Sequence, residues 1–294
     1  MKMKKTTLVL MVAGLFAASY AMALPKTTVE NSTIENENKD VNNTATEKSK
    51  INSGIEAVGA EIKDSEIYNK NTRVTNEAKE GSKINSGVEL NNAKVTEGSL
   101  IDNKNTEVIN KAEGKSKINS GIEANDATIK GSTLINENTN VKNTAKGGSI
   151  INSGIEANGA KILDGSKLEN TNQNVTNIAE DKSKINSGIE ANGATIKDGS
   201  TITNENIGRV ENTAKGGSKI NSGIELNNAN VTDGSTIKNT NKDVTNEATN
   251  KALINSGIQA NNADIKNSTI INTNDGVKNK ADNSVINSGI NLGD

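Results

Sequence analysis

The chain has 294 residues, with 34 lysines and arginines against 36 aspartates and glutamates, and it contains no cysteine, histidine or tryptophan. This composition excludes disulfide staples, thiolate nucleophiles and imidazole metal ligands. The balanced, interspersed charge gives no basic footprint for nucleic acid. Only 1% of the residues are aromatic, so we do not expect a conventional globular core.

The first residues have the pattern of a secretory signal peptide. MKMKK is basic, residues 6–20 are largely apolar, and Ala21-Met22-Ala23 offers a cleavage site of small residues. We therefore predict a signal peptide over residues 1–23 and a secreted chain over residues 24–294, at the cell surface or outside the cell. No second hydrophobic segment follows, so no membrane insertion is expected. The secreted part holds 31 basic against 36 acidic residues.

Beyond the leader, one ten-residue phrase recurs along the chain. It reads INSGIEANGA at residues 151–160, and the eight copies are separated by 33, 34, 33, 34, 35, 34 and 32 residues. The copies begin at Ile51, Ile84, Ile118, Ile151, Ile185, Ile220, Ile254 and Ile286. So regular a period predicts a solenoid.

Within each repeat, small or apolar residues alternate with polar ones. In the copy that starts at Ser49, the first set is Ser49, Ile51, Ser53, Ile55 and Ala57, and Lys50, Asn52, Gly54 and Glu56 lie between them. Period two is the strand period, so we predict an all-β protein, a parallel β-helix-like solenoid of eight repeats of about 34 residues. The single-residue length changes fall between the alternating runs, at Asp-Gly, Gly-Gly and Lys-Gly pairs, which predicts corners there.

Asparagine occupies several of the positions that the alternation places inside. When identical rungs stack about 4.8 Å apart, each buried amide can bond the asparagines above and below it. The alternative, that these residues lie in exposed turns, stays open because asparagine tolerates a positive φ. The predicted stacking ladder consists of the Asn-x-Asn pairs Asn36, Asn38, Asn69, Asn71, Asn103, Asn105, Asn136, Asn138, Asn170, Asn172, Asn204, Asn206, Asn239, Asn241, Asn272 and Asn274.

The number of coils in one repeat is open at this point. Each repeat divides into two 17-residue halves that both begin Ser-x-Ile, so it could form one large layer or two successive smaller coils. One large layer would stack the outward glutamates at one strand spacing, where they would repel unless lysines neutralise them. This repulsion favours two coils. The glutamates are Glu56, Glu89, Glu123, Glu156, Glu190 and Glu225.

Nothing in the secreted part predicts catalysis or a cofactor. Its carboxylates recur at equivalent positions in other repeats, whereas the two carboxylates of a glycoside hydrolase need different environments in one cleft. The spacing GGxGxD of a calcium-binding roll does not occur, and Lys146-Gly147-Gly148 lacks the remainder of a phosphate loop. We therefore predict no enzyme, no cofactor and no metal site.

The pattern S-x-I-x-N-x-N-x-x-V-x-N-x-A followed by S-x-I-N-S-G-I resembles the repeats of bacterial functional-amyloid fibre subunits, namely Fap-type fibril proteins and curlin. The resemblance covers residues 27–294 in repeat style, with asparagine where those families use glutamine. It implies a secreted subunit that polymerises with itself into biofilm fibres, served by a nucleator subunit and an outer-membrane secretion pore.

Open solenoid ends support the same expectation, since unpaired strand edges template further pairing and no polar cap is evident in this sequence. We therefore expect end-to-end or cross-β association of copies. The alternative is a monomeric, surface-exposed solenoid that acts as an adhesin or stalk. That reading needs an attachment device, and none is visible between residues 24 and 294.

Overall fold

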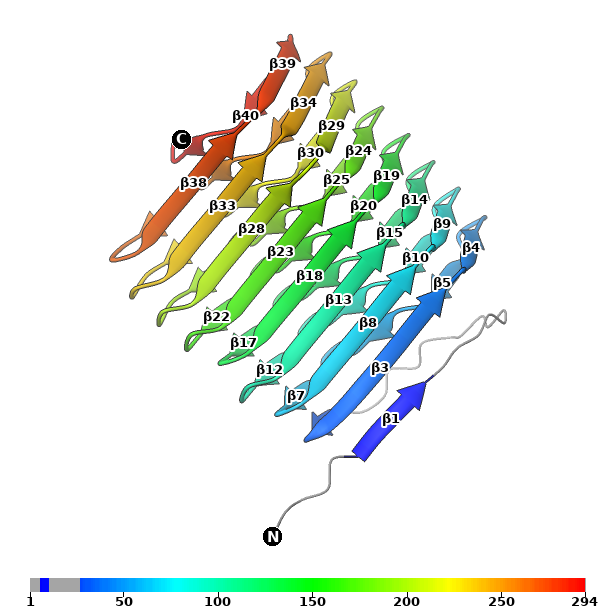
Figure 1. Ribbon diagram of the computed structural model, residues 1–294, viewed down its shortest axis with the longest axis vertical. Helices are drawn as coiled ribbons and strands as arrows, with labels where there is room; N and C mark the ends of the chain where they lie inside the picture. Colours follow the sequence, from blue (N-terminus) through cyan, green and yellow to red (C-terminus); the bar gives the residue numbers. More distant parts are fainter. Residues whose placement is uncertain (1–5, 11–26, 294) are drawn as a thin grey trace.

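The computed structural model describes residues 6–10 and 27–293, and this part of the chain is an all-β parallel solenoid of eight rungs. Strands of successive repeats lie side by side along one axis (Figure 1). Five sheets run along the solenoid, and each rung contributes one strand to each sheet. We number the sheets I to V in the order in which the chain visits them from β3 to β7.

Sheet I has the long strands β1 (Thr6–Leu10), β3 (Ser32–Lys39), β8 (Glu66–Thr72), β13 (Leu100–Thr106), β18 (Thr133–Thr139), β23 (Lys167–Gln173), β28 (Thr201–Ile207), β33 (Thr236–Lys242) and β38 (Thr269–Asp275). Sheet II contains β4 (Asn42–Ala45), β9 (Thr75–Ala78), β14 (Ile109–Ala112), β19 (Lys142–Ala145), β24 (Thr176–Ala179), β29 (Val210–Lys215), β34 (Val244–Thr249) and β39 (Lys278–Asp282).

The recurring phrase forms sheets III and IV. Sheet III contains β5 (Lys50–Asn52), β10 (Lys83–Asn85), β15 (Lys117–Asn119), β20 (Ile150–Asn152), β25 (Lys184–Asn186), β30 (Lys219–Asn221), β35 (Leu253–Asn255) and β40 (Val285–Asn287). Sheet IV contains β6 (Ile55–Glu56), β11 (Val88–Glu89), β16 (Ile122–Glu123), β21 (Ile155–Glu156), β26 (Ile189–Glu190), β31 (Ile224–Glu225), β36 (Ile258–Gln259) and β41 (Ile290–Asn291).

Sheet V supplies the first strand of each rung and contains β2 (Thr28–Glu30), β7 (Glu61–Lys63), β12 (Lys94–Thr96), β17 (Thr128–Lys130), β22 (Lys161–Leu163), β27 (Thr195–Ile196), β32 (Asn230–Val231) and β37 (Asp264–Ile265). The corners use the predicted turn formers. Asp164 and Gly165, for example, both have left-handed backbones, with φ of 53° and 71°.

The pairing register shows that one 34-residue repeat makes one layer. Ile84 pairs with Ile51 on one side and with Ile118 on the other, each a whole repeat away. The preference for two 17-residue coils was therefore wrong. It rested on repulsion between stacked glutamates, and Glu123 does pair directly with its equivalents in the neighbouring rungs. Lysines neutralise most of this column, as described below.

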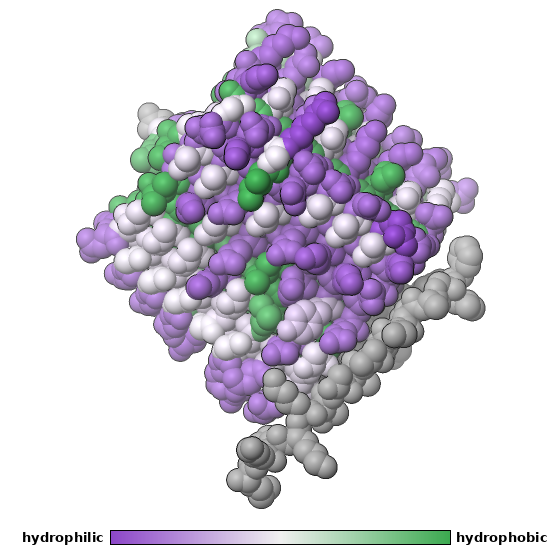
Figure 2. Space-filling view, in the orientation of Figure 1, coloured by the Kyte–Doolittle hydropathy of each residue, from purple (hydrophilic) through white to green (hydrophobic). Residues whose placement is uncertain are grey.

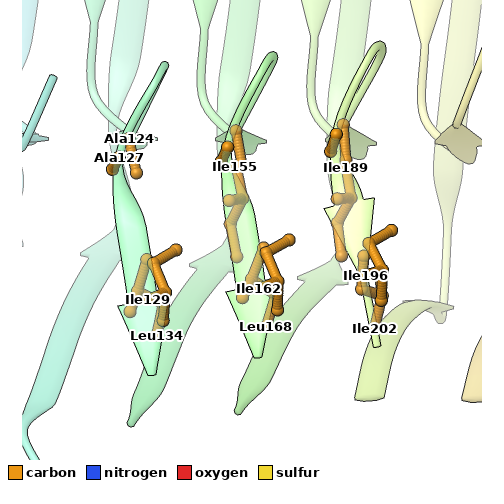
Figure 3. Close-up of a cluster of buried hydrophobic side chains, with 14 of the residues drawn as sticks. Ala124, Ala127, Ile129, Leu134, Ile155, Ile162, Leu168, Ile189, Ile196 and Ile202 are labelled. Carbon is orange, nitrogen blue, oxygen red and sulfur yellow. The ribbon is translucent and has the colours of Figure 1, made fainter. Parts of the chain in front are cut away.

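The interior has two main apolar columns separated by polar side chains, and a short third column of valines stacks at the corner between sheets I and II. The larger column lies between sheets I, IV and V, where residues such as Ile129, Leu134 and Ile155 are fully buried and stack on their equivalents in the next rung (Figure 3). The smaller column joins the alanines of sheet II to the isoleucines of sheet III, such as Ala112 and Ile118. Strand alternation places these residues inside, as the period-two pattern predicts.

The leader is only partly described. The predicted cleavage site at residues 21–23 lies outside the described residues. Thr6–Leu10 forms β1, which pairs in parallel with β3 so that Thr7 lies beside Thr33 and Leu10 beside Asn36. Within residues 6–10 and 27–293, the structure has no helix long and apolar enough to span a membrane.

Candidate functional site: amide ladders and a charged groove

The predicted ladder asparagines lie on the inner side of sheet I and form two continuous columns. Each Nδ2 donates to Oδ1 of the equivalent asparagine in the next rung toward the C-terminus. The distances are 2.6–2.8 Å in the column from Asn36 to Asn272 and 2.7–2.9 Å in the column from Asn38 to Asn274. The structure thus brings all sixteen residues together in pairs, one pair per rung.

The second hydrogen of each amide nitrogen points across the same rung. Asn103 Nδ2 and Asn105 Nδ2 lie 2.7 and 2.8 Å from the carbonyl oxygen of Ser120, the serine of the recurring phrase. Because a carbonyl can only accept, these contacts fix which amide atom is the nitrogen. The ladders therefore have a definite direction along the solenoid.

A third ladder uses the Asn-x-Ala asparagines of sheet II. Asn76 Nδ2 donates to Asn110 Oδ1 at 2.9 Å, and the column runs without a break from Asn43 to Asn279. In each rung the phrase serine donates its hydroxyl to this asparagine, as Ser120 Oγ does to Asn110 Oδ1 at 2.9 Å. One serine thus meets three asparagines, a convergence that the sequence did not predict.

The glycine of the phrase permits close stacking. The chain bends at Gly121, and a Cβ atom built there would overlap the carbonyl oxygen of Gly154 in the next rung. No side chain fits in that position without moving backbone. A fourth asparagine ladder, on the outer side of the bend, runs in the opposite direction. Asn119 Nδ2 donates to Asn85 Oδ1 at 3.0 Å, and Asn119 Oδ1 accepts from the Gly121 N–H at 3.1 Å.

The bend gathers lysines and glutamates into what we call the charged groove. Lys117 Nζ lies 2.8 Å from Glu123 Oε1, although residues six apart in a straight strand would be about 20 Å apart. Only 1% of the Glu123 side chain is exposed. The pattern repeats, at 2.5–3.2 Å, in Lys50–Glu56, Lys83–Glu89, Lys184–Glu190 and Lys219–Glu225.

The pKa values of these lysines reflect the stacked carboxylates. Burial alone would lower the pKa of Lys117, but the negative charge of Glu123 and its hydrogen bond raise the pKa above its usual value, and Glu156 and Glu89 add to the effect. The pKa of Lys184 is raised for the same reasons, and its nearest carboxylate is Glu190. The groove therefore favours the charged form of both lysines.

One rung departs from this rule. Ile150 stands where its neighbours have Lys117 and Lys184, so Glu156 has no lysine of its own. Burial raises the pKa of Glu156, and the charges of Glu123 and Glu190 on either side raise it further. In the two rungs nearest the C-terminus the lysine is also lost, but there the glutamate is replaced too, by Gln259 and Asn291.

The described residues contain no group of three or more acidic, histidine or cysteine side chains arranged to hold a metal ion. The predicted asparagines make up a polar core, and the groove is filled by its own ion pairs.

The fold and its amide ladders define a repeat protein of the parallel β-solenoid class. No protein-family model and no curated protein matches the chain.

Solved structures that resemble it share little sequence with it. HetL, a pentapeptide repeat protein involved in heterocyst differentiation regulation from the cyanobacterium Nostoc sp. strain PCC 7120, is 7% identical, with 82% of this chain and 87% of HetL covered and a TM-score of 0.17. A hyper-glycosylated TibA fragment is 15% identical, with coverage of 85% and 100% and a TM-score of 0.17. The A-module of the Azotobacter vinelandii mannuronan C-5 epimerase AlgE6 is 13% identical, with coverage of 91% and 84% and a TM-score of 0.14. Similarity this low carries no functional argument.

Proposed function

We propose that this chain is a secreted structural protein whose copies associate into extracellular, amyloid-like fibres of a biofilm matrix. The observation that supports this proposal most directly is the identity of the stacking contacts from rung to rung. The same amide, isoleucine and glycine contacts recur at every step, so a rung of one copy can in principle continue the stack of another. Export through an outer-membrane pore and a nucleator subunit belong to the same proposal.

Electron microscopy of negatively stained protein tests this function. We expect unbranched fibrils when the purified chain is concentrated, a fibre reflection at about 4.7–4.8 Å and binding of an amyloid dye. A chain that remains monomeric at high concentration, with no such reflection, would contradict the proposal.

The alternative is a monomeric adhesin or stalk at the cell surface. The hydrogen bonds of the interior rungs favour it. Each ladder amide there already has its partners within one copy, so these amides need no second chain to complete their hydrogen bonds. Discrete short rods in the micrographs, at concentrations where the first proposal expects fibrils, would support this reading.

A further inference from the structure

We propose that two copies of this chain dock head to tail, with β37–β41 of one copy against β2–β6 of the other in the register that continues the rungs. The inference rests on the proposed function and specifies the contact that would build the fibre. We call the outer edge of β2–β6 the head and the outer edge of β37–β41 the tail. In the described part of the chain, these rungs pair with neighbouring rungs on one side only, apart from the short β1 on β3.

The three inner ladders give the head and the tail opposite hydrogen-bonding character. Every Nδ2 donates toward the tail, so at the tail Asn272, Asn274 and Asn279 each retain an amide hydrogen with no acceptor among the described residues. At the head, the described residues supply no donor to Oδ1 of Asn36 or Asn38.

A tail placed on a head therefore matches donors with acceptors in both Asn-x-Asn columns. Two heads would bring carbonyl oxygens together, and two tails would bring N–H groups together. The outer ladder favours the same head-to-tail contact. Its amides donate toward the head, so, in the described part of the chain, its free donor lies at the head and its free acceptor at the tail. Among the described residues nothing accepts from Asn52 Nδ2 at the head, and Asn287 Oδ1 at the tail is the matching acceptor. All of the complete ladders thus favour one polarity.

The backbone and the apolar residues agree with this polarity. All rungs pair in parallel and in register, so continuing the pattern sets Asn272 against Asn36 and Ile286 against Ile51 of the second copy. The tail is also unusually apolar. Four of the eight exposed large hydrophobic residues among the described residues lie between positions 271 and 292, namely Ile271, Val285, Ile290 and Leu292. Hydrophobic residues, in green, gather beside the C-terminal end of the chain in Figure 2, and docking would cover part of this surface.

Two backbone N–H groups allow each edge to be blocked separately. Ile258 N donates to Gly289 O at 2.9 Å, so the equivalent N–H of Ile290 points off the tail, toward Gly54 O of a docked copy. Thr75 N donates to Val41 O at 2.8 Å, so the equivalent N–H of Asn42 points off the head. Each of these strands has one neighbour among the described residues, and the alternation of ladder bonds turns both N–H groups away from it. Ile290→Pro and Asn42→Pro therefore leave the ladder of the single chain intact.

The experiment compares these two variants, each alone and mixed, with the protein purified as the cell leaves it. We expect each proline variant alone to lose at least tenfold in fibre mass. An equimolar mixture should form one-to-one heterodimers in sedimentation velocity and native mass spectrometry, because one variant keeps its head and the other its tail. Ile290→Ala and Asn42→Ala retain the N–H group and should assemble as the wild type does. Far-UV circular dichroism checks that all four variants fold.

The outcomes separate the two proposals. A wild-type chain that never associates overturns the fibre function and the docking together. A wild type that forms fibres while either proline variant alone forms homodimers, or still forms long fibres, overturns head-to-tail docking and leaves the fibre function standing.

Discussion

The charged groove predicts that Lys117 stabilises the solenoid far more than an exposed lysine does. In Lys117→Met the hydrocarbon stem is largely retained, but the ammonium that neutralises Glu123 is lost. Glu123 is almost fully buried, and the carboxylates of Glu89 and Glu156 flank it in the adjacent rungs. The variant therefore leaves an unpaired buried charge between two like charges.

The expected loss follows from the burial of the pair. Removing one partner of a buried ion pair costs about 3–5 kcal/mol. Since 36% of the Lys117 side chain is exposed, water screens part of the interaction. We therefore expect a loss of about 2–3 kcal/mol in the free energy of unfolding. The matched control is Lys104→Met, which breaks the exposed pair with Glu137 at 2.8 Å, where 49% and 42% of the two side chains are exposed. That change should cost about 0.5 kcal/mol or less.

The assay is urea unfolding followed by far-UV circular dichroism, at protein concentrations low enough to keep the chain monomeric. The double variant Lys117→Met with Glu123→Gln removes both charges, so it should recover most of the lost stability. Equal unfolding midpoints for Lys117→Met and Lys104→Met, or no recovery in the double variant, would refute the view that the groove is a buried ion-pair column.

Three further predictions concern other parts of the same stack. Glu156→Gln should stabilise the chain near pH 8, because it removes a buried charge that lies between Glu123 and Glu190. The advantage over the wild type should shrink as the pH falls, since the folded pKa of Glu156 is raised and protonation removes the same charge. A difference in urea midpoint that stays constant across the pH range would contradict this. Gly121→Ala should lower the free energy of unfolding by about 3 kcal/mol or more, because the added Cβ overlaps the next rung. Gly165→Ala has open space around it, so it should lose only about 1–2 kcal/mol, from its left-handed backbone alone. Thermal unfolding of both variants measures the difference. A chain without residues 1–23 should begin to assemble several-fold sooner than the full chain in a dye-binding time course, because β1 occupies the edge of β3 at residues 32–36; identical lag times would show that β1 does not compete with docking.

Much of the fold follows from local pattern. The 32- to 35-residue spacing of the phrase and the alternation of Ile118, Ser120 and Ile122 with polar residues predict stacked parallel strands, and the structure has them. The size of the layer could not be obtained in this way. Both halves of a repeat begin Ser-x-Ile, so alternation alone does not distinguish a partner 17 residues away from one 34 residues away.

The sequence nevertheless contained a signal for the charged groove. In five repeats a lysine stands six residues before the phrase glutamate, and Ile150 before Glu156 is the one exception among the glutamates. Where Leu253 and Val285 replace the lysine, Gln259 and Asn291 replace the glutamate. Joint loss of both charges indicates that they neutralise each other, which removes the repulsion that argued against one large layer. The inner role of the phrase serine carried no such signal, because it depends on a bend that brings Ser120 toward residues 15 to 17 positions earlier.

The choice of asparagine for the interior has a consequence that isoleucine could not provide. A column of stacked isoleucines buries apolar surface equally well whether the next rung arrives parallel or reversed, since hydrophobic contact has no direction. A primary amide has donors on one side and an acceptor on the other, so an amide column is satisfied in one direction only. Reversing a rung would leave buried amide groups unpaired in all three inner ladders, at about 1–3 kcal/mol for each group. The isoleucines therefore supply most of the apolar burial along the stack, and the asparagines determine its polarity, within one copy and, on the docking proposed above, between copies.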